Sequence, residues 1–196
     1  MSLRIYGNRQ LKTVPGKDTR PTVARVREAV FNIWQGTITE CRWLDLCAGT
    51  GSMGAEALCR GASLVIGIEQ SGRACGVIKQ NWEQVASDGQ KWQLFKGDVV
   101  GELAKLSQQL SETQLSKKKF DPIQFDRIYF DPPYASELYR PVLETIHQQK
   151  ILEVSGEIAV EHNPKTWTPI AVDGWEICRQ KVYGNTGLTF YVNLGY

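Results

Sequence analysis

The chain has 196 residues, 42% of them hydrophobic and 22% charged, which is enough for one well-packed domain and unlike a disordered chain. No stretch reaches the apolar length of a membrane span and residues 1–4 lack a signal-peptide core, so we expect a cytoplasmic protein without a membrane partner. Five cysteines without a C-x-x-C pair argue against a disulfide framework or a zinc site, and we expect no metal.

Positive charge is concentrated near the N-terminus. The net charge is +2, but residues 1–30 carry seven basic and two acidic side chains, a balance of +5, so the remainder sums to −3. Such a basic arm favours a partner with a phosphate backbone, and the alternative is an ordinary solvated surface. Its basic residues are Arg4, Arg9, Lys12, Lys17, Arg20, Arg25 and Arg27.

The first elements in chain order are a hairpin and a helix. Gly7-Asn8 lies between two short stretches with apolar residues and predicts the tight turn of a β-hairpin formed by residues 3–6 and 10–14. Apolar side chains then recur at three- and four-residue steps, which predicts an amphipathic helix over residues 22–35 with Thr22 as its N-cap. The apolar stripe consists of Val23, Val26, Val30 and Ile33.

After residue 40 the pattern alternates between strand and helix. Short apolar runs predict strands at residues 43–47, 64–68, 92–95, 125–130 and 157–160. Helices are predicted at residues 52–59, 72–86, 99–110 and about 138–149. This alternation indicates an α/β, Rossmann-like fold with a mostly parallel sheet covered on both faces. The tail predicts an antiparallel hairpin at the C-terminal edge, from residues 175–183 and 188–194.

The chain shows no linker between two large domains. Residues 111–124, which include three consecutive lysines, have no apolar period and predict an exposed loop. We therefore expect two parts, a basic hairpin-and-helix extension over residues 1–36 and a Rossmann-like domain over residues 37–196, in a monomer.

The most informative motif follows the predicted strand at 125–130. Asp131-Pro132-Pro133-Tyr134 combines an acid, two rigid residues without backbone donors and an aromatic ring. Such a loop suits a planar, amine-bearing group, which would stack on the ring and donate hydrogen bonds to Asp131 and a proline carbonyl. The alternative is a strand-ending turn with a half-buried tyrosine.

A glycine-rich turn follows the first strand of the alternating region. Gly49, Gly51 and Gly54 match G-x-G-x-x-G, which lets a backbone approach a nucleotide cofactor closely, although glycines also permit tight packing between strand and helix. Glu69 ends the next strand, 20 residues after Gly49, where an acid can accept both ribose hydroxyls. An ordinary exposed acid is the alternative for Glu69.

Further acids belong to the same edge of the predicted sheet. Asp45 lies inside an apolar strand, where its carboxylate requires a cationic ligand or backbone N–H groups of the glycine turn. Asp98 follows the third strand and could accept from an adenine amino group, or could simply belong to a turn. Because ligands bind at the carboxyl ends of parallel strands, these acids and Asp131 should converge on one crevice.

Together these motifs resemble the bacterial RsmD-type 16S rRNA guanine-N2 methyltransferases, which use S-adenosylmethionine. The resemblance extends over nearly the whole chain. It is carried by the glycine turn, Glu69, Asp98 and Asp-Pro-Pro-Tyr in this order, and further by Arg20-Pro21-Thr22, Val26 to Asn32, Leu44-Asp45-Leu46, Glu56-Ala57-Leu58, Arg60-Gly61-Ala62 and Tyr183-Gly184-Asn185-Thr186. The chain departs from the family pattern at Cys47, at Gln70 and in a longer loop at 111–124.

The resemblance implies a class I methyltransferase with S-adenosylmethionine as cofactor and 16S rRNA, or a small-subunit assembly intermediate, as partner. The residues implied to act on the guanine are Asp131, Pro132, Pro133 and Tyr134. Those implied at the cofactor are Asp45, Ala48, Gly49, Thr50, Gly51, Glu69, Gln70, Asp98, Val99 and Asp131. Those implied to contact RNA are Arg4, Arg9, Lys12, Arg20, Thr22, Arg25 and Arg27.

Other functions remain open on the sequence alone. An amino-methyltransferase acting on DNA adenine or cytosine, or on a protein glutamine, would carry a related tetrapeptide. A nicotinamide-dependent oxidoreductase would share the glycine turn and Glu69 but has no use for Asp-Pro-Pro-Tyr. A non-catalytic RNA-binding protein with this fold would be expected to have lost the acid or the aromatic residue.

Overall fold

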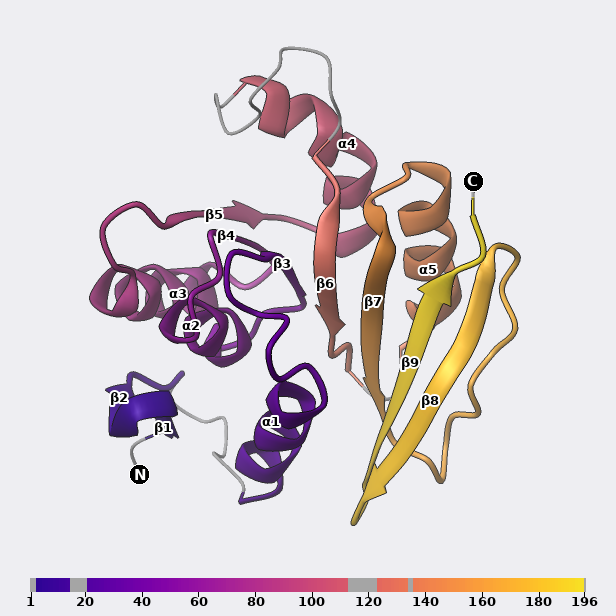
Figure 1. Ribbon diagram of the computed structural model, residues 1–196, viewed down its shortest axis with the longest axis horizontal. Coiled ribbons are helices and arrows are strands. Elements are labelled where there is room, and N and C mark those ends of the chain that lie inside the picture. The colour runs from indigo at the N-terminus through magenta and orange to yellow at the C-terminus, as the bar shows by residue number, and fades with distance from the viewer. Residues whose placement is uncertain (1–2, 15–20, 113–122, 134–135, 196) are drawn as a thin grey trace.

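The centre of the computed structural model is a seven-stranded sheet, with the strand order β5-β4-β3-β6-β7-β9-β8 (Figure 1). The structure describes residues 3–14, 21–112, 123–133 and 136–195. The strands of this sheet are β3 (Arg42–Leu46), β4 (Leu64–Glu69), β5 (Lys91–Lys96), β6 (Phe125–Phe130), β7 (Leu152–His162), β8 (Trp175–Tyr183) and β9 (Thr186–Asn193).

The direction of the strands agrees with the predicted fold class. Strands β3 to β7 pair parallel to their neighbours, whereas β9 pairs antiparallel with both β7 and β8. The α/β fold with a mostly parallel sheet and an antiparallel hairpin at its C-terminal edge is thereby confirmed. Within that hairpin, β9 lies next to β7 and β8 forms the edge.

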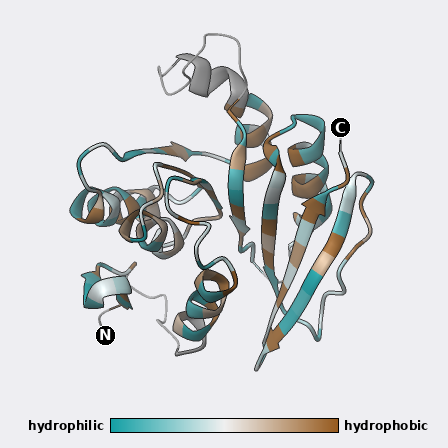
Figure 2. Cartoon of the chain, in the orientation of Figure 1, coloured by the Kyte–Doolittle hydropathy of each residue, from teal (hydrophilic) through white to brown (hydrophobic). Residues whose placement is uncertain are grey.

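Helices cover both faces of the sheet. On one face lie α1 (Pro21–Ile33), α2 (Ser52–Cys59) and α3 (Gly72–Val85), and on the other α4 (Val99–Glu112) and α5 (Tyr139–Gln148). Figure 2 shows that the helices carry both hydrophobic and hydrophilic residues, as amphipathic helices against a sheet require. No helix in the described part of the chain combines the length and hydropathy needed to cross a membrane.

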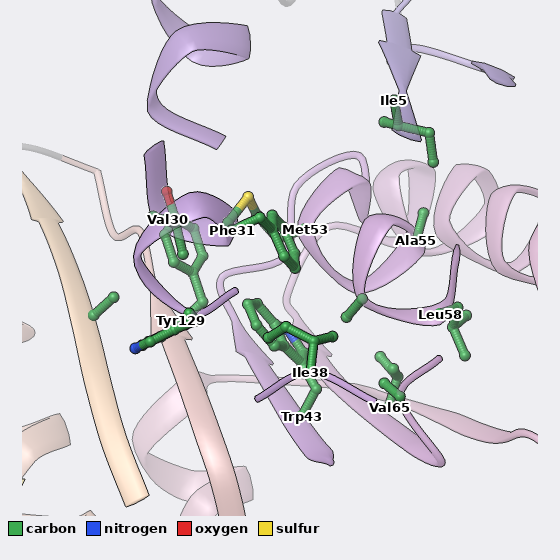
Figure 3. Close-up of a cluster of buried hydrophobic side chains, with 14 of the residues drawn as sticks. Ile5, Val30, Phe31, Ile38, Trp43, Met53, Ala55, Leu58, Val65 and Tyr129 are labelled. Carbon is green, nitrogen blue, oxygen red and sulfur yellow. The ribbon is translucent and has the colours of Figure 1, made fainter. Parts of the chain in front are cut away.

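The N-terminal hairpin packs into the first of these layers. It consists of β1 (Leu3–Ile5), the short 3₁₀ turn Tyr6–Asn8 and β2 (Arg9–Leu11), and its turn uses positive φ angles of 69° at Gly7 and 60° at Asn8. Its apolar side chains join the core cluster that α1, α2 and β3 share, and Figure 3 shows Ile5, Phe31, Met53 and Trp43 within it.

Several predicted boundaries need correction. Helix α1 begins at Pro21, so Thr22 lies in its first turn and is not the N-cap; proline suits the first helical position because its missing N–H would have no intrahelical partner. Helix α4 continues to Glu112, into the predicted loop, of which residues 113–122 lie outside the described part. Strand β7 begins at Leu152, five residues earlier than predicted, with a register irregularity against β6.

Candidate active site at the carboxyl edge of the sheet

A cavity of about 650 Å³ opens where the parallel strands end. In parallel α/β sheets this edge is the usual ligand site, because successive loops meet there. The predicted cofactor residues all line the cavity except Gly51, and so do Asp131, Pro132 and Pro133. Tyr134 lies outside the described residues.

The turn after β3 is shaped by left-handed backbone conformations. Cys47, Gly49 and Gly51 have φ angles of 62°, 59° and 71°. Glycine adopts this region without steric cost, which explains two of the three positions. The third, Cys47, faces the cavity, and burial together with the neighbouring Glu69 and Asp131 carboxylates raises the pKa of its thiol to about 12. The thiol therefore stays protonated and is no nucleophile.

Gly51 serves packing and does not line the cavity. Its carbonyl oxygen accepts a 2.7 Å hydrogen bond from Nε1 of Trp82 in α3. A Cβ on Gly51, Gly54 or Gly67 would come within 2.8 Å, 2.4 Å or 2.5 Å of the Trp82 indole. Gly51 and Gly54 of the fingerprint, together with Gly67 of β4, thus make room for a fully buried tryptophan between α2, α3 and β4. The cofactor contact expected at Gly51 stays a prediction.

Glu69 ties the end of β4 to the glycine turn. Its Oε2 accepts a 2.8 Å hydrogen bond from the Gly49 N–H, and its Oε1 accepts one of 2.8 Å from the Ser71 N–H. A carboxylate has about four lone-pair sites, so two backbone donors still leave capacity for hydroxyl groups of a ligand. Glu69 is buried at the cavity wall and is no ordinary exposed acid.

The buried Asp45 carboxyl group has a backbone hydrogen-bond donor, as its position inside β3 requires. Its Oδ2 accepts a 3.0 Å hydrogen bond from the Gly54 N–H in the first turn of α2. Burial raises the pKa of Asp45 to about 8, the Gly54 bond lowers it, and the Glu69 charge raises it. A cation in the cavity would favour the ionised form of this carboxyl.

Asp98 belongs to the turn before α4 and also lines the cavity. Its Oδ1 accepts a 2.9 Å hydrogen bond from the Gly101 N–H, so it caps the N-terminus of α4, and it also lines the cavity. Its neighbour Val99 is buried and adds apolar surface to the same wall, whereas Gln70 lines the cavity from an exposed position.

The segment after β6 is anchored by its backbone. The Asp131 N–H donates a 3.3 Å hydrogen bond to the Leu46 carbonyl, and the Pro133 carbonyl accepts one of 2.8 Å from the Ser136 N–H. Pro132 is buried, Pro133 is exposed, and Asp131 is half-buried. The acid is therefore held by β3 beside the glycine turn, as the convergence of strand ends predicted.

The cavity wall also contains residues that were not among the predicted site residues, including Leu3, Met53, Tyr129 and Glu161. The Tyr129 hydroxyl donates a short hydrogen bond to Oε2 of Glu161, and both side chains are buried. Glu161 directly follows the apolar run at 158–160, so an acid at the end of a buried strand was an available signal. Leu3 had none, because only the tertiary fold brings β1 to this edge.

The cavity is strongly acidic. Among the described residues that line it are five carboxylates and no lysine, arginine or histidine. The carboxylates are Asp45, Glu69, Asp98, Asp131 and Glu161. In a partly buried site such a set attracts a cationic ligand and disfavours the two phosphates of a dinucleotide. No group of His, Cys, Asp and Glu within the described part of the chain has the arrangement of a metal site.

The N-terminal hairpin, which carries part of the basic arm, reaches the cavity at Leu3. Arg4, Arg9, Lys12 and Arg25 have exposed side chains, while Arg20 lies outside the described residues and the Thr22 side chain is likewise not described. Three of the four make contacts on the surface: Arg4 donates to Asn8 Oδ1, Arg9 to Cys59 Sγ and Lys12 to Gln80 Oε1.

Arg27 does not belong to that surface. It is only 3% exposed, and its Nε donates a 2.6 Å hydrogen bond to Oε2 of the buried Glu56 in α2. Its Nη2 donates to the Arg4 carbonyl at 2.5 Å, and Arg60 pairs with the other Glu56 oxygen at 2.8 Å. The expectation of an RNA contact at Arg27 is corrected, because this guanidinium is used to fasten the hairpin to α2.

Comparison with known proteins identifies the family. Residues 3–192 match the family described as Conserved hypothetical protein 95. The protein YlbH of Bacillus subtilis (strain 168) is 31% identical over 187 residues, which cover 95% of each chain. The chain belongs to this family. The family comprises S-adenosylmethionine-dependent methyltransferases with a Rossmann-like fold, so the resemblance found in the sequence is confirmed.

Two further relatives and two structures extend the comparison. The Ribosomal RNA small subunit methyltransferases D of Haemophilus influenzae and Escherichia coli (strain K12) are 26% and 25% identical, over 96% of this chain and 91% and 89% of theirs. The solved structure of yhhF from Escherichia coli superposes with a TM-score of 0.80 at 24% identity, and that of HI0767 from Haemophilus influenzae with 0.75 at 24%, each over 100% of both chains. These structures show the same fold.

Proposed function

We propose that this protein transfers a methyl group from S-adenosylmethionine to the exocyclic N2 of one guanine in 16S rRNA, either free or in a small-subunit assembly intermediate, in the cytoplasm. The observation that carries the proposal is the position of Asp131 and Pro132 in the wall of a cavity with five carboxylates and no basic side chain. The names of the two methyltransferases D support the rRNA substrate.

The described residues fit the cofactor. S-adenosylmethionine is a cation at its sulfonium and supplies an electrophilic methyl group when bound. Ala48, Gly49 and Thr50 would line its methionine part, Glu69 would accept from the ribose hydroxyls, and Asp98 with Val99 would meet the adenine. The acid-lined wall and the family both speak against a nicotinamide-dependent oxidoreductase.

Asp131 and Pro132 would hold the guanine amine. The lone pair of guanine N2 is delocalised into the ring, which makes this nitrogen a poor nucleophile. Hydrogen bonds donated by the amine to the Asp131 carboxylate and the Pro132 carbonyl would favour a pyramidal nitrogen with its lone pair toward the methyl donor. The Pro133 carbonyl already accepts from Ser136, so we assign the second acceptor to Pro132. N2 would gain the methyl group with S-adenosylhomocysteine as the leaving product, and the proton that N2 loses would pass to solvent.

The base must leave its stack to enter this cavity, as enzymes that modify bases require. Tyr134 would then stack on the guanine, while the exposed basic residues of the arm would hold the flanking phosphates. These residues would do the positioning that a strong electrophile needs, without a charged nucleophile in the protein.

The first test is a mass-spectrometric map of N2-methylguanine in small-subunit rRNA from cells with and without this gene. Loss of one N2-methylguanine is the expected result, and an identical map would contradict the proposal.

In vitro, Asp131→Ala should lower methyl transfer by about 100-fold or more, because it removes a group that positions the reacting amine. Cofactor binding, measured by calorimetry, should fall far less than methyl transfer, and the exposed Asp88→Ala is the control.

A further inference from the structure

Glu161, one of the acids that line the cavity, has no role in the methyl transfer proposed above. Glu161 lies near the end of β7, which runs parallel to β6 with Phe130 paired to Val160. Continuing that register by one residue sets Glu161 beside Asp131 on adjacent strands, whose spacing is about 4.8 Å. Both carboxylates line the cavity, and Glu161 is only 7% exposed.

Tyr129 fixes the orientation of this carboxylate. Its hydroxyl donates to Glu161 Oε2, and the tyrosine side chain is 4% exposed on the same cavity wall. Burial, together with the charges of Glu161 and Asp131, raises the pKa of Tyr129 well above its ordinary value, so the hydroxyl keeps its proton and acts as a donor. Glu161 consequently presents an acceptor, held by a hydrogen bond, next to the acid that would bind the amine.

Two neighbouring acceptors match one edge of one base. In guanine the ring nitrogen next to the exocyclic amine, N1, carries a hydrogen and is a donor. In adenine and cytosine the ring nitrogen next to the amine, N1 or N3, is an acceptor. We propose that Glu161 accepts the N1–H of the target guanine while Asp131 accepts from N2, which makes Glu161 the residue that selects guanine and Tyr129 its positioning residue.

This assignment rests on the proposed function and deepens it. An adenine or cytosine amine at Asp131 would direct a ring lone pair at the Glu161 carboxylate. Such a contact sets two acceptors against each other and adds repulsion, which is the way that sites built around hydrogen bonds reject the wrong ligand. The acid pair therefore favours guanine over both alternative amine-bearing bases.

The experiment compares guanine with 2-aminopurine, which keeps the 2-amino group but has an acceptor at N1. Each base is placed by ligation at the mapped position of small-subunit rRNA, and methyl transfer is measured for the wild type and Glu161→Gln. The wild type should prefer guanine, and Glu161→Gln should lower kcat/KM for guanine by roughly 10- to 100-fold. The glutamine amide can donate to the N1 of 2-aminopurine, so the guanine preference should fall by a similar factor.

The preference for guanine over 2-aminopurine is compared between the wild type and Glu161→Gln. The different intrinsic reactivity of the two amines affects both enzymes equally and cancels in this comparison. Tyr129→Phe should weaken the guanine preference less than Glu161→Gln, since it loosens the carboxylate without removing it. Glu157→Gln, on the same strand outside the cavity, is the matched control and should keep the full preference. Calorimetric binding of S-adenosylmethionine reports whether each variant is folded.

The outcomes separate this inference from the proposed function. If the wild type makes N2-methylguanine but Glu161→Gln keeps the same preference, Glu161 is not the selecting residue and the proposed function stands. A wild type that transfers methyl groups equally to both bases would overturn the inference even if the variants fail to fold. Methylation of adenine or cytosine by the wild type would overturn both.

Discussion

Asp45 shows how one buried acid can link the cavity to the stability of the fold. Its side chain is 1% exposed inside β3 and receives one backbone hydrogen bond, from Gly54. Because burial raises its pKa to about 8, the carboxyl holds a proton over much of the neutral range when no cation is near. A cationic ligand would stabilise the ionised form, so ligand binding and ionisation of Asp45 are coupled.

The pH dependence of stability tests this coupling. A folded-state pKa of about 8, above the ordinary value of 3.8, means that the folded chain binds a proton that the unfolded chain has already lost. The stabilising contribution of Asp45 is therefore complete below about pH 4 and disappears as the pH rises through about 8. Asp45→Asn should remove this loss, measured as the free energy of urea unfolding at several pH values. Equal profiles for variant and wild type would contradict the assignment.

The affinity for S-adenosylmethionine should show the opposite trend. As the pH rises toward 8, Asp45 ionises more readily and the affinity of the acid-lined cavity for the cation should increase. In Asp45→Asn this increase should be smaller. Calorimetric titrations over the same pH range provide the measurement, and Asp88→Asn, an exposed aspartate, is the control.

The packing of α2, α3 and β4 against one another depends on glycines that face a large side chain, that of Trp82. Trp82 of α3 is fully buried and fills the space left by Gly54 of α2 and Gly67 of β4. The Trp82 indole therefore packs between α2, which follows the glycine turn, and the sheet. The position of the cavity wall follows from this packing, since the same turn carries Gly49.

Adding one methyl group tests that packing. Gly54→Ala should lower the free energy of unfolding by about 1–3 kcal/mol, because its Cβ would lie 2.4 Å from the Trp82 ring. Gly76→Ala, in the middle of α3, has nothing within 4 Å of its Cβ and should instead be neutral or stabilise the fold by up to about 1 kcal/mol. Urea unfolding of both variants gives the comparison. A neutral Gly54→Ala would show that the indole can move at little cost.

Acidic and basic side chains lie in different parts of the molecule. Acidic side chains line the cavity, whereas exposed basic side chains lie in or directly after the N-terminal hairpin, at Arg4, Arg9 and Lys12. Leu3 of this hairpin reaches the cavity wall. The buried Arg27–Glu56 pair holds this hairpin against α2. A polyanion bound to the arm would therefore lie close to a cavity that attracts cations, which suits a substrate that presents a neutral base on a phosphate chain.

The salt dependence of RNA binding tests the role of the basic arm. Replacing Arg4, Arg9 and Lys12 with glutamine should weaken binding of small-subunit rRNA and reduce the slope of log K against log salt by roughly 2. The affinity for S-adenosylmethionine should not change. Glutamine at Lys91, Lys105 and Lys150 makes the same change in net charge elsewhere and is the control. An equal loss in both variants would show that only net charge matters.

Much of the fold was predictable because local patterns decide it. Helix α2 and strand β6 have the predicted bounds, since turn residues and apolar periodicity mark their ends. The early start of β7 was missed because the buried Leu152 is followed by three residues, Glu153 to Ser155, that are partly or fully exposed and form no apolar run. Arg27 was misassigned although it lies four residues after Val23 and three before Val30, on the buried face of the helix.

Local sequence patterns are enough to predict the order of the elements, the glycine turn and the acids at the ends of the strands, because each depends on neighbouring residues and on strand and helix periods. Which side chains share the cavity depends instead on contacts between distant segments. Parallel pairing of Phe130 with Val160 carries the next residues, Asp131 and Glu161, to one cavity, and the docking of the hairpin brings Leu3 to the same wall. The burial that turns Arg27 inward and keeps Asp45 protonated likewise depends on packing between segments, which no local pattern encodes.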